Sequence, residues 1–170
     1  AIGYVAQTPF LFSDAMDANI SYGVDGAAES QIRQAAEEAQ VREDIDALGQ
    51  GFATVIGERG VTLSGGQKQR TTLARALLRR PEILILDDCL SAVDTSTEEA
   101  ILGHLRRIMG QRTTILIAHR ISTLRAADHI IVLDDGCIAE QGTHLELVAA
   151  DGIYADLARR QQLADELEQM

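Results

Sequence analysis

A short aliphatic run that ends in two aspartates constrains the fold of this chain more than any other feature. Residues 83–86 read Ile-Leu-Ile-Leu, Pro81 precedes them, and Asp87 and Asp88 follow directly. An unbroken apolar run of this length predicts a parallel strand that is covered on both faces. Ligands of open α/β sheets bind beyond the carboxyl ends of such strands, so the two aspartates are expected at a binding edge.

The two aspartates have a chemical and a purely structural interpretation. Mg²⁺ takes one or two carboxylates together with water and phosphate oxygens, so Asp87 suits a magnesium ligand. Asp88, one residue later, is suited to orient an attacking water. The alternative is a polar turn that ends the strand, with Asp88 capping the next helix. The aspartates by themselves favour that alternative.

A second segment, residues 63–70, reads Leu-Ser-Gly-Gly-Gln-Lys-Gln-Arg. Ser64 and Gln67 have the spacing of a capping box, which predicts that Ser64 is the N-cap of a helix running through Leu78. Gly65 and Gly66 lack a β-carbon, so phosphate can approach their amides at the positive end of the helix dipole. A capped helix without a ligand is the alternative. The flanking residues and the carboxylate strand favour phosphate binding.

Five motifs, which follow one another along the chain in the family's order, resemble those of the nucleotide-binding domain of an ABC transporter, specifically the exporter branch. Residues 63–70 resemble the signature motif, Ile83–Asp87 the Walker B strand, and residues 91–94 (Ser-Ala-Val-Asp) the D-loop. Gln7 resembles the Q-loop glutamine, and His119 resembles the switch histidine. Residues 57–60 (Gly-Glu-Arg-Gly) are similar to the exporter X-loop. In the C-terminal part, residues 136–142, 143–144 and 152–154 follow the exporter pattern. The resemblance extends over essentially all 170 residues.

The resemblance implies an α/β fold, a partial P-loop NTPase (RecA-like) parallel sheet with the ABC α-helical subdomain. It also implies an organisation along the chain. Residues 1–13 are expected to form a strand and the Q-loop, and residues 14–78 the helical subdomain with the signature motif. Residues 79–142 are expected to form the RecA-like core with Walker B, D-loop and switch histidine. Residues 143–170 are expected to form C-terminal helices.

The resemblance also implies a site for ATP and Mg²⁺ that two such domains share head to tail. The resemblance assigns catalytic roles to Asp88, His119 and Gln7. It assigns the binding of Mg²⁺ to Asp87 and Gln7. The signature residues, which bind the partner domain's ATP, are Leu63, Ser64, Gly65, Gly66 and Gln67, and the D-loop residues are Ser91 and Asp94. The implied partners are a second nucleotide-binding domain and a transmembrane domain, at the cytoplasmic face of the membrane.

The sequence departs from the family pattern in two ways. A Gly-rich loop ending in Lys-Ser/Thr, which binds most of the triphosphate in P-loop ATPases, is missing from these residues. Without this loop we expect negligible ATP affinity and no hydrolysis by the chain alone. The chain also opens without Met, as a fragment or processed product would. Asp88 occupies the position at which the family's catalytic base is usually glutamate. In this respect the chain resembles the half of a heterodimeric exporter that lines the weak site. The alternative is a homodimer that tolerates aspartate at this position.

Composition narrows the possible partners. The net charge of −11 argues against nucleic acid as a partner, because binding to its phosphates requires clustered Lys and Arg. The apolar runs are too short for a transmembrane helix or a secretory signal. Cys89 and Cys137 are expected to be small buried apolar residues in a reducing compartment. Two other functions compete with the exporter ATPase: a non-hydrolysing truncated interaction module, and a soluble ABC-type ATPase without the usual insertions.

Periodicity predicts the remaining elements. Residues 2–6, 113–118 and 129–133 are expected as strands of the sheet, with 136–141 as a hairpin partner. Helices are expected at 29–40, 41–48, 65–80, 95–109, 143–150 and 152–168, and Asp94 is expected to cap the helix from 95. Because the Walker A strand is central in P-loop folds, its absence is expected to leave a gap in the sheet and unpaired edges that favour self-association or strand exchange.

Overall fold

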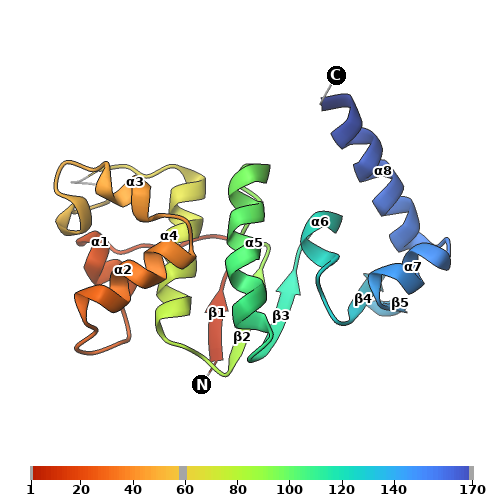
Figure 1. The fold of residues 1–170 in the computed structure, drawn as a ribbon, viewed down its shortest axis with the longest axis horizontal. Coiled ribbons are helices and arrows are strands. Elements are labelled where there is room, and N and C mark those ends of the chain that lie inside the picture. Colours follow the sequence, from red (N-terminus) through yellow and green to blue (C-terminus); the bar gives the residue numbers. More distant parts are fainter. Residues whose placement is uncertain (1, 58–60, 169–170) are drawn as a thin grey trace. The chain divides into compact units, whose positions relative to one another are not determined.

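The structure is a computed structural model that describes residues 2–57 and 61–168 (Figure 1). The chain divides into two compact units, one ending at Ile117 and one beginning at Ala118, and each is described by itself. None of the helices in the described ranges combines the length and the apolar content that crossing a bilayer requires.

The first unit is built on a three-stranded parallel sheet. Its strands are β1 (Ile2–Val5), β2 (Ile83–Asp87) and β3 (Thr113–Ile117), in the spatial order β1-β2-β3. Tyr4 of β1 pairs with Ile85 of β2, and Ile85 pairs with Ile115 of β3. The predicted strand at residues 83–87 is therefore confirmed as the central one of these three, and its two aspartates lie at the carboxyl edge of the sheet.

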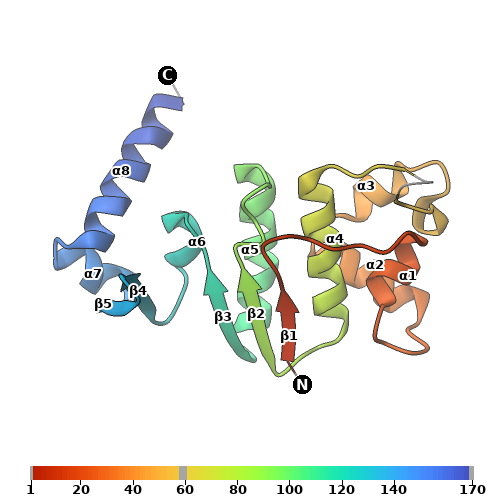
Figure 2. The ribbon, with the colours of Figure 1, turned by 180° about the vertical axis from the view of Figure 1, so that it is seen from behind.

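One face of this sheet is buried and the other is not. Val5, Leu84 and Leu86 are fully buried on the face over which α5 (Thr95–Met109) lies (Figures 1 and 2). Successive side chains of a strand point to opposite faces, so their neighbours lie on the other side. That face exposes Ile2, Tyr4, Ile115 and Ile117 by 46–61%. Within the described residues, the expectation that both faces are covered is thus wrong.

A cluster of helices adjoins the sheet in the first unit. It consists of α1 (Met16–Ser21), α2 (Glu29–Glu38), α3 (Arg42–Asp46), the 3₁₀ turn η1 (Gly51–Ala53) and α4 (Gly65–Leu78). The long α4 packs against α1 and α2, because its apolar side chains share one core with theirs. The fully buried members of this core include Met16, Ile20, Ala36, Leu73 and Ala74.

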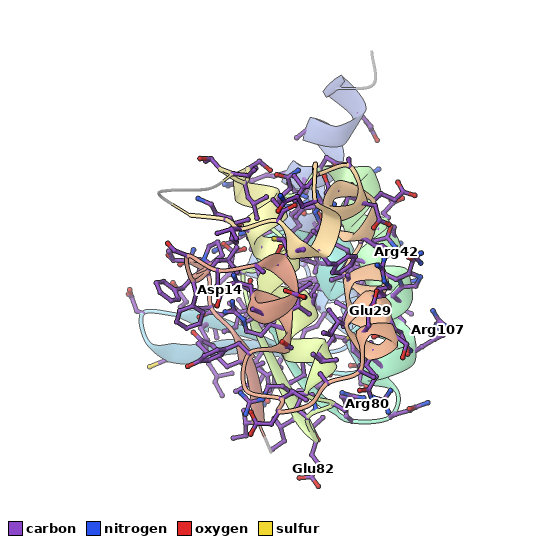
Figure 3. The ribbon with its side chains drawn as sticks, turned by 90° about the vertical axis from the view of Figure 1, so that its left-hand side faces the viewer. Asp14, Glu29, Arg42, Arg80, Glu82 and Arg107 are labelled. Carbon is purple, nitrogen blue, oxygen red and sulfur yellow. The ribbon has the colours of Figure 1, made fainter. Side chains whose placement is uncertain are left out.

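The outer surface of the helical cluster is charged. Glu29 and Arg42 lie there on α2 and α3 (Figure 3). Arg33 contacts Glu29 and Asp46, and Arg42 contacts Glu37 and Asp46, at N–O distances between 2.9 and 3.5 Å. Because all these side chains are substantially exposed, each pair contributes at most about 1 kcal/mol, and the core holds the helices together.

The second unit contains α6 (Ile121–Leu124), β4 (Ile130–Asp134), β5 (Cys137–Gly142), α7 (His144–Ala149) and α8 (Ile153–Glu168). Among the described strands, β4 pairs only with β5, antiparallel, so the expectation that residues 129–133 join the parallel sheet is wrong. Asp135 and Gly136 form the two-residue turn with positive φ angles of 45° and 76°, which suits a tight hairpin.

The two cysteines differ. Cys89 is buried, as predicted, whereas Cys137 is exposed, which corrects the expectation that both are interior residues. The reason is local, because Cys137 is the first residue of β5 and directly follows the hairpin turn. A residue at the tip of a two-stranded hairpin has little protein around it.

Candidate nucleotide-binding site

The carboxyl edge of the parallel sheet brings Gln7 and the two aspartates together. The Nε2 atom of Gln7 donates a hydrogen bond to Oδ2 of Asp88 at 3.2 Å. The hydroxyl of Tyr4 donates to Oδ2 of Asp87 at 2.9 Å. Because β1 and β2 are parallel neighbours, their carboxyl ends meet at one edge, and Gln7 lies two residues beyond β1.

Asp88 adopts a backbone conformation that few residue types tolerate. Its φ angle is +46°, and its amide donates to the carbonyl oxygen of Ile117 at 2.9 Å. Aspartate and asparagine enter this left-handed region more readily than other non-glycine residues. Asp88 does not cap the next helix, because α5 begins at Thr95 and Asp94 caps it by accepting from the Thr97 amide at 3.0 Å.

Tyr4 is a site residue that the sequence analysis missed. Its hydrogen bond to Asp87 raises the pKa of the Tyr4 phenol, with burial and the negative charge of Asp87 acting in the same direction. Tyr4 stands on the same sheet face as Asp87, since Tyr4 pairs with Ile85 and Asp87 follows two residues later. Only the strand register reveals this neighbour, so no local sequence signal could have found it.

The donor set is compatible with magnesium. Two adjacent carboxylates and an amide side chain lie at the sheet edge, and Mg²⁺ needs only one or two carboxylates when phosphates and waters complete its shell. Gln7 bonds to Asp88 through its side-chain nitrogen, so its side-chain oxygen, the atom that would bind a cation, is not used in that bond. Groups of three or more His, Cys, Asp or Glu side chains that could hold a metal ion do not occur among the described residues.

The signature segment begins α4 as predicted. The Gln67 amide donates to Oγ of Ser64 at 3.2 Å, and the Ser64 amide donates to Oε1 of Gln67 at 3.0 Å, so the capping box is confirmed. Gln67 also donates to Asp44 of α3 at 2.9 Å. Leu63 is buried at 6% exposure, whereas Ser64 and Gly65 are exposed. The start of the helix is therefore anchored by Leu63 and Gln67, while Ser64 and Gly65 are accessible from solvent.

Gly66 is required by the neighbouring D-loop. A β-carbon on Gly66 would lie 2.9 Å from the carbonyl oxygen of Ala92, too close for any other residue type without a shift. Gly65 meets only the Ala92 side chain, at an ordinary 3.7 Å. The two signature glycines thus differ, since only Gly66 is needed for packing within this chain.

Gln69 links the signature helix to the D-loop. The Ala92 amide donates to Oε1 of Gln69 at 3.0 Å, and Nε2 of Gln69 donates to Oγ of Ser91 at 3.3 Å. Ser91 in turn donates to the carbonyl oxygen of Asp88 at 3.0 Å. Gln69 is only 4% exposed. Gln69 is not identifiable as a site residue from the sequence, because only its burial distinguishes it from a surface glutamine.

The segment after Gln7 is held by Arg75 and Asn19. The guanidinium of Arg75 donates to the Phe10 carbonyl at 2.9 Å and to the Asn19 carbonyl at 2.7 Å. Burial lowers the pKa of this guanidinium. Fully buried Asn19 accepts from the Phe12 amide at 2.8 Å and donates back to the Phe12 carbonyl at 3.0 Å. Neither Arg75 nor Asn19 belongs to a motif that the sequence singles out.

An open pocket of about 170 Å³ lies between this segment and α4. Thr8, Pro9 and Phe10 line one side, and Thr72, Arg75 and Arg79 line the other. Phe10, Phe12 and Tyr22 form a chain of aromatic contacts beside it, with ring centroids 5.1 and 4.5 Å apart. Phe10 and Tyr22 are 65% and 55% exposed, so this aromatic edge is available for contact.

His119 belongs to the second unit and follows β3 by two residues. Its catalytic role as the switch histidine stays a prediction. Within its own unit, the His119 carbonyl accepts from Nε2 of Gln161 at 2.9 Å. The X-loop resemblance falls on residues 57–60, of which 58–60 lie outside the described residues.

A parallel sheet with carboxylates at its carboxyl edge, joined to a helical cluster that presents a capped, glycine-bearing helix start, is the architecture of an ABC-type ATP-binding domain. The comparisons with known proteins agree. The profile of the family described as "ABC transporter" matches residues 1–91. The chain belongs to the ABC transporter family, and its exporter-type nucleotide-binding domain is the part represented here.

Similar proteins include several exporters. The chain is 48% identical over 161 residues to the ATM1-type heavy metal exporter of Novosphingobium aromaticivorans, covering 95% of the chain and 26% of that protein. It is 50% identical over 162 residues to the probable multidrug resistance ABC transporter ATP-binding/permease protein YheI of Bacillus subtilis, covering 95% and 28%. The solved structure of a bacterial Atm1-family ABC exporter with ATP bound superposes with a TM-score of 0.90 at 48% identity, covering 95% of the chain and 29% of that chain. The chain thus spans less than a third of each.

Proposed function

We propose that this chain forms one part of an ATP-hydrolysing site in an ABC exporter and couples ATP turnover to transport. The observation that carries the proposal is the hydrogen bond between Gln7 and Asp88, which brings the Q-loop glutamine and the second Walker B carboxylate to one sheet edge. In this role Asp88 orients the attacking water and accepts its proton. His119 contacts the γ-phosphate from the strand end.

Asp87 and Gln7 hold Mg²⁺ in this proposal. When bound, Mg²⁺ neutralises charge on the phosphate oxygens. Tyr4 already orients the Asp87 carboxylate through its hydroxyl, so the carboxylate does not need to rotate freely before a cation arrives. This preorganisation lowers the cost of assembling the site.

The signature helix serves the ATP of a second nucleotide-binding domain. Leu63 and Gln67 anchor the start of α4, while Ser64, Gly65 and Gly66 offer a hydroxyl and backbone amides to the partner's γ-phosphate. The dipole of this 14-residue helix favours the anion. ATP then joins two domains, identical or different, and hydrolysis releases them. Ser91 and Asp94 of the D-loop lie beside the same interface, since Gln69 ties Ser91 to α4.

The aromatic edge beside the open pocket is proposed to contact the transmembrane partner. Phe10 and Tyr22 are large exposed aromatics, and Arg75 fixes the Phe10 backbone to α4. This edge begins three residues after Gln7, so a movement of Gln7 on nucleotide binding is transmitted a short distance. In this role the chain lies at the cytoplasmic face of a membrane.

Asp88 in place of glutamate supports a finer assignment. The shorter side chain withdraws the carboxylate by roughly one carbon–carbon bond, and an ångström of misplacement costs about 100-fold in rate. We infer that Asp88 lines the weaker of two sites, while the complete signature segment serves the competent site of a partner that carries glutamate.

The test of nucleotide binding is a calorimetric titration of the 170-residue chain with Mg-ATP. Without a Walker A loop in these residues, we expect no measurable heat of binding. Micromolar, Mg²⁺-dependent binding would contradict the assignment of most phosphate contacts to a loop outside this sequence.

The test of hydrolysis uses the full-length protein that contains this chain. Asp88→Asn should reduce ATP turnover at this site. Asp135→Asn is the matched control, because Asp135 also has a positive φ angle, of 45°, and sits in an exposed hairpin turn. Asparagine tolerates that conformation, so neither substitution strains the backbone. Equal turnover in the two variants would remove Asp88 from the mechanism.

A further inference from the structure

The C-terminal helix α8 reaches back to the segment that carries His119. One side chain makes the contact. Gln161 donates from Nε2 to the carbonyl oxygen of His119 at 2.9 Å and accepts at Oε1 from the amide of Ile121 at 2.5 Å. A single carboxamide therefore engages two backbone groups on either side of Arg120.

The short helix α6 explains why such a contact is needed. The first amides of a helix have no partner inside the helix, and Ile121 is the first residue of α6. The N-cap residue is Arg120, whose guanidinium has only donor groups and cannot accept from an amide. Gln161 supplies an acceptor for the Ile121 amide from outside the helix.

The beginning of α8 is firmly held, so Gln161 is presented from a fixed base. The Glu140 carboxylate of β5 accepts from the amides of Ile153 and Tyr154 at 2.6 and 3.0 Å. Tyr154 is 1% exposed, and its hydroxyl is 2.9 Å from Nδ1 of His144. A β-carbon on Gly152 would lie 2.0 Å from the Glu140 carboxylate, so only glycine permits this approach.

Helical spacing carries the anchored face along to Gln161. Tyr154 and Ala158 pack in the core of the second unit and are separated by four residues. Gln161 follows three residues later, on the same face and about 10 Å along the helix axis from Tyr154. The helix therefore connects the β4–β5 hairpin to the backbone at His119.

We propose that Gln161 is a positioning residue for His119. By fixing the His119 carbonyl and the Ile121 amide, α8 sets the backbone conformation of residues 119–121. The inference rests on the proposed function, in which His119 contacts the γ-phosphate. Displacing the backbone at His119 then lowers the rate of hydrolysis more than the affinity for ATP.

Hydrogen exchange tests the contact independently of hydrolysis. In the full-length protein, Gln161→Leu should speed amide exchange in the peptide that contains Ile121, because the acceptor of its amide is lost. Gln162→Leu is the matched control, since the exposed Gln162 carboxamide donates to Glu166 of the same helix at 3.0 Å. Unchanged exchange in Gln161→Leu would overturn the inference.

Steady-state kinetics tests the positioning role. We expect Gln161→Leu to lower kcat about tenfold, within the ~100-fold that an ångström of misplacement costs, with KM for ATP nearly unchanged. In a His119→Ala background the same substitution should have almost no further effect, since residues acting through one another are non-additive.

Three kinetic outcomes are decisive. Additive losses in the double variant overturn the positioning role, because Gln161 would then act on stability and not through His119. An unchanged kcat beside faster exchange overturns it as well. If the wild-type protein lacks ATPase activity, the proposed function fails and takes the positioning role with it, while the exchange result still decides the contact.

Discussion

Gln7 donates a hydrogen bond to the carboxylate of Asp88 across 81 residues of sequence. The bond exists because β1 and β2 are parallel neighbours whose carboxyl ends meet. It couples the segment that leads to the aromatic edge with the carboxylate proposed to orient water. A change in the position of one is therefore felt by the other without any intermediate residue.

Lengthening Asp88 tests the weak-site assignment. Asp88→Glu should raise ATP turnover of the full-length protein, because the longer side chain brings the carboxylate about one ångström closer to the water. The upper limit of the gain is ~100-fold, the rate that such a misplacement costs. Glutamate is less suited than aspartate to the φ of +46°, so the melting temperature should fall slightly. Turnover is measured by phosphate release, and an unchanged rate would remove the weak-site assignment.

Ser64 can be tested as a cap and as a phosphate ligand separately. Ser64→Ala should cost about 1 kcal/mol of stability, because the Gln67 amide loses its acceptor. Ser64→Asp retains the cap and should leave stability near that of the wild type, but its charge repels the partner's γ-phosphate. We expect ATP-dependent domain association to be lost in Ser64→Asp, as in the bulkier Ser64→Arg. Association that persists in Ser64→Asp would show that no phosphate comes near this residue.

Gln69 should matter although it touches no nucleotide. Gln69→Leu removes the acceptor of the Ala92 amide in a part-buried contact, which costs about 1 kcal/mol. Gln34→Leu, an exposed glutamine on α2 that bonds Glu38, is the control and should cost far less. Urea denaturation measures both. Equal stabilities of the two variants would show that the link between α4 and the D-loop contributes nothing.

The two thiols should differ sharply in reactivity. Burial raises the pKa of Cys89 to about 12, so at pH 8 roughly one molecule in ten thousand carries the thiolate, which is the reactive form. Cys137 is exposed. Iodoacetamide should modify Cys137 in the native protein and Cys89 only after denaturation, as read by peptide mass spectrometry. Rapid native labelling of Cys89 would contradict its burial.

A polypeptide of these 170 residues alone should self-associate. The sheet face with Ile2, Tyr4, Ile115 and Ile117 is exposed and apolar, and β3 has one neighbour among the described strands. Light scattering should report species larger than the 18.4 kDa monomer. Ile115→Lys should reduce the association, whereas Leu163→Lys on α8 should not. A dilute monomer in the unmodified polypeptide would contradict the prediction.

Local signals in the sequence predicted local structure well. Ser64 and Gln67 are three residues apart and form the capping box, and Asp94 caps the helix from Thr95. The apolar run at residues 83–87 is a strand of the parallel sheet. The two caps depend on interactions within a few residues, which spacing alone specifies, and the strand is indicated by its own run of apolar residues.

Predictions that depended on distant contacts fared less well. The burial of both sheet faces, the place of β4 in the parallel sheet and the burial of Cys137 were wrong within the described residues. Each depends on which other segment packs nearby, and an apolar strand reads the same whether one face or both are covered. The roles assigned to Asp87, Asp88 and His119 remain predictions.

The sequence by itself determined the family, the order of the motifs and the caps of the two longest helices of the first unit, because these are written in residue types and short spacings. Only the tertiary structure decided that Tyr4 holds Asp87, that Gln69 holds Ala92 and that Gln161 holds the backbone at His119. Those contacts join residues 23 to 83 positions apart. Strand register, helix packing and burial select such partners, and no short pattern in the chain encodes them.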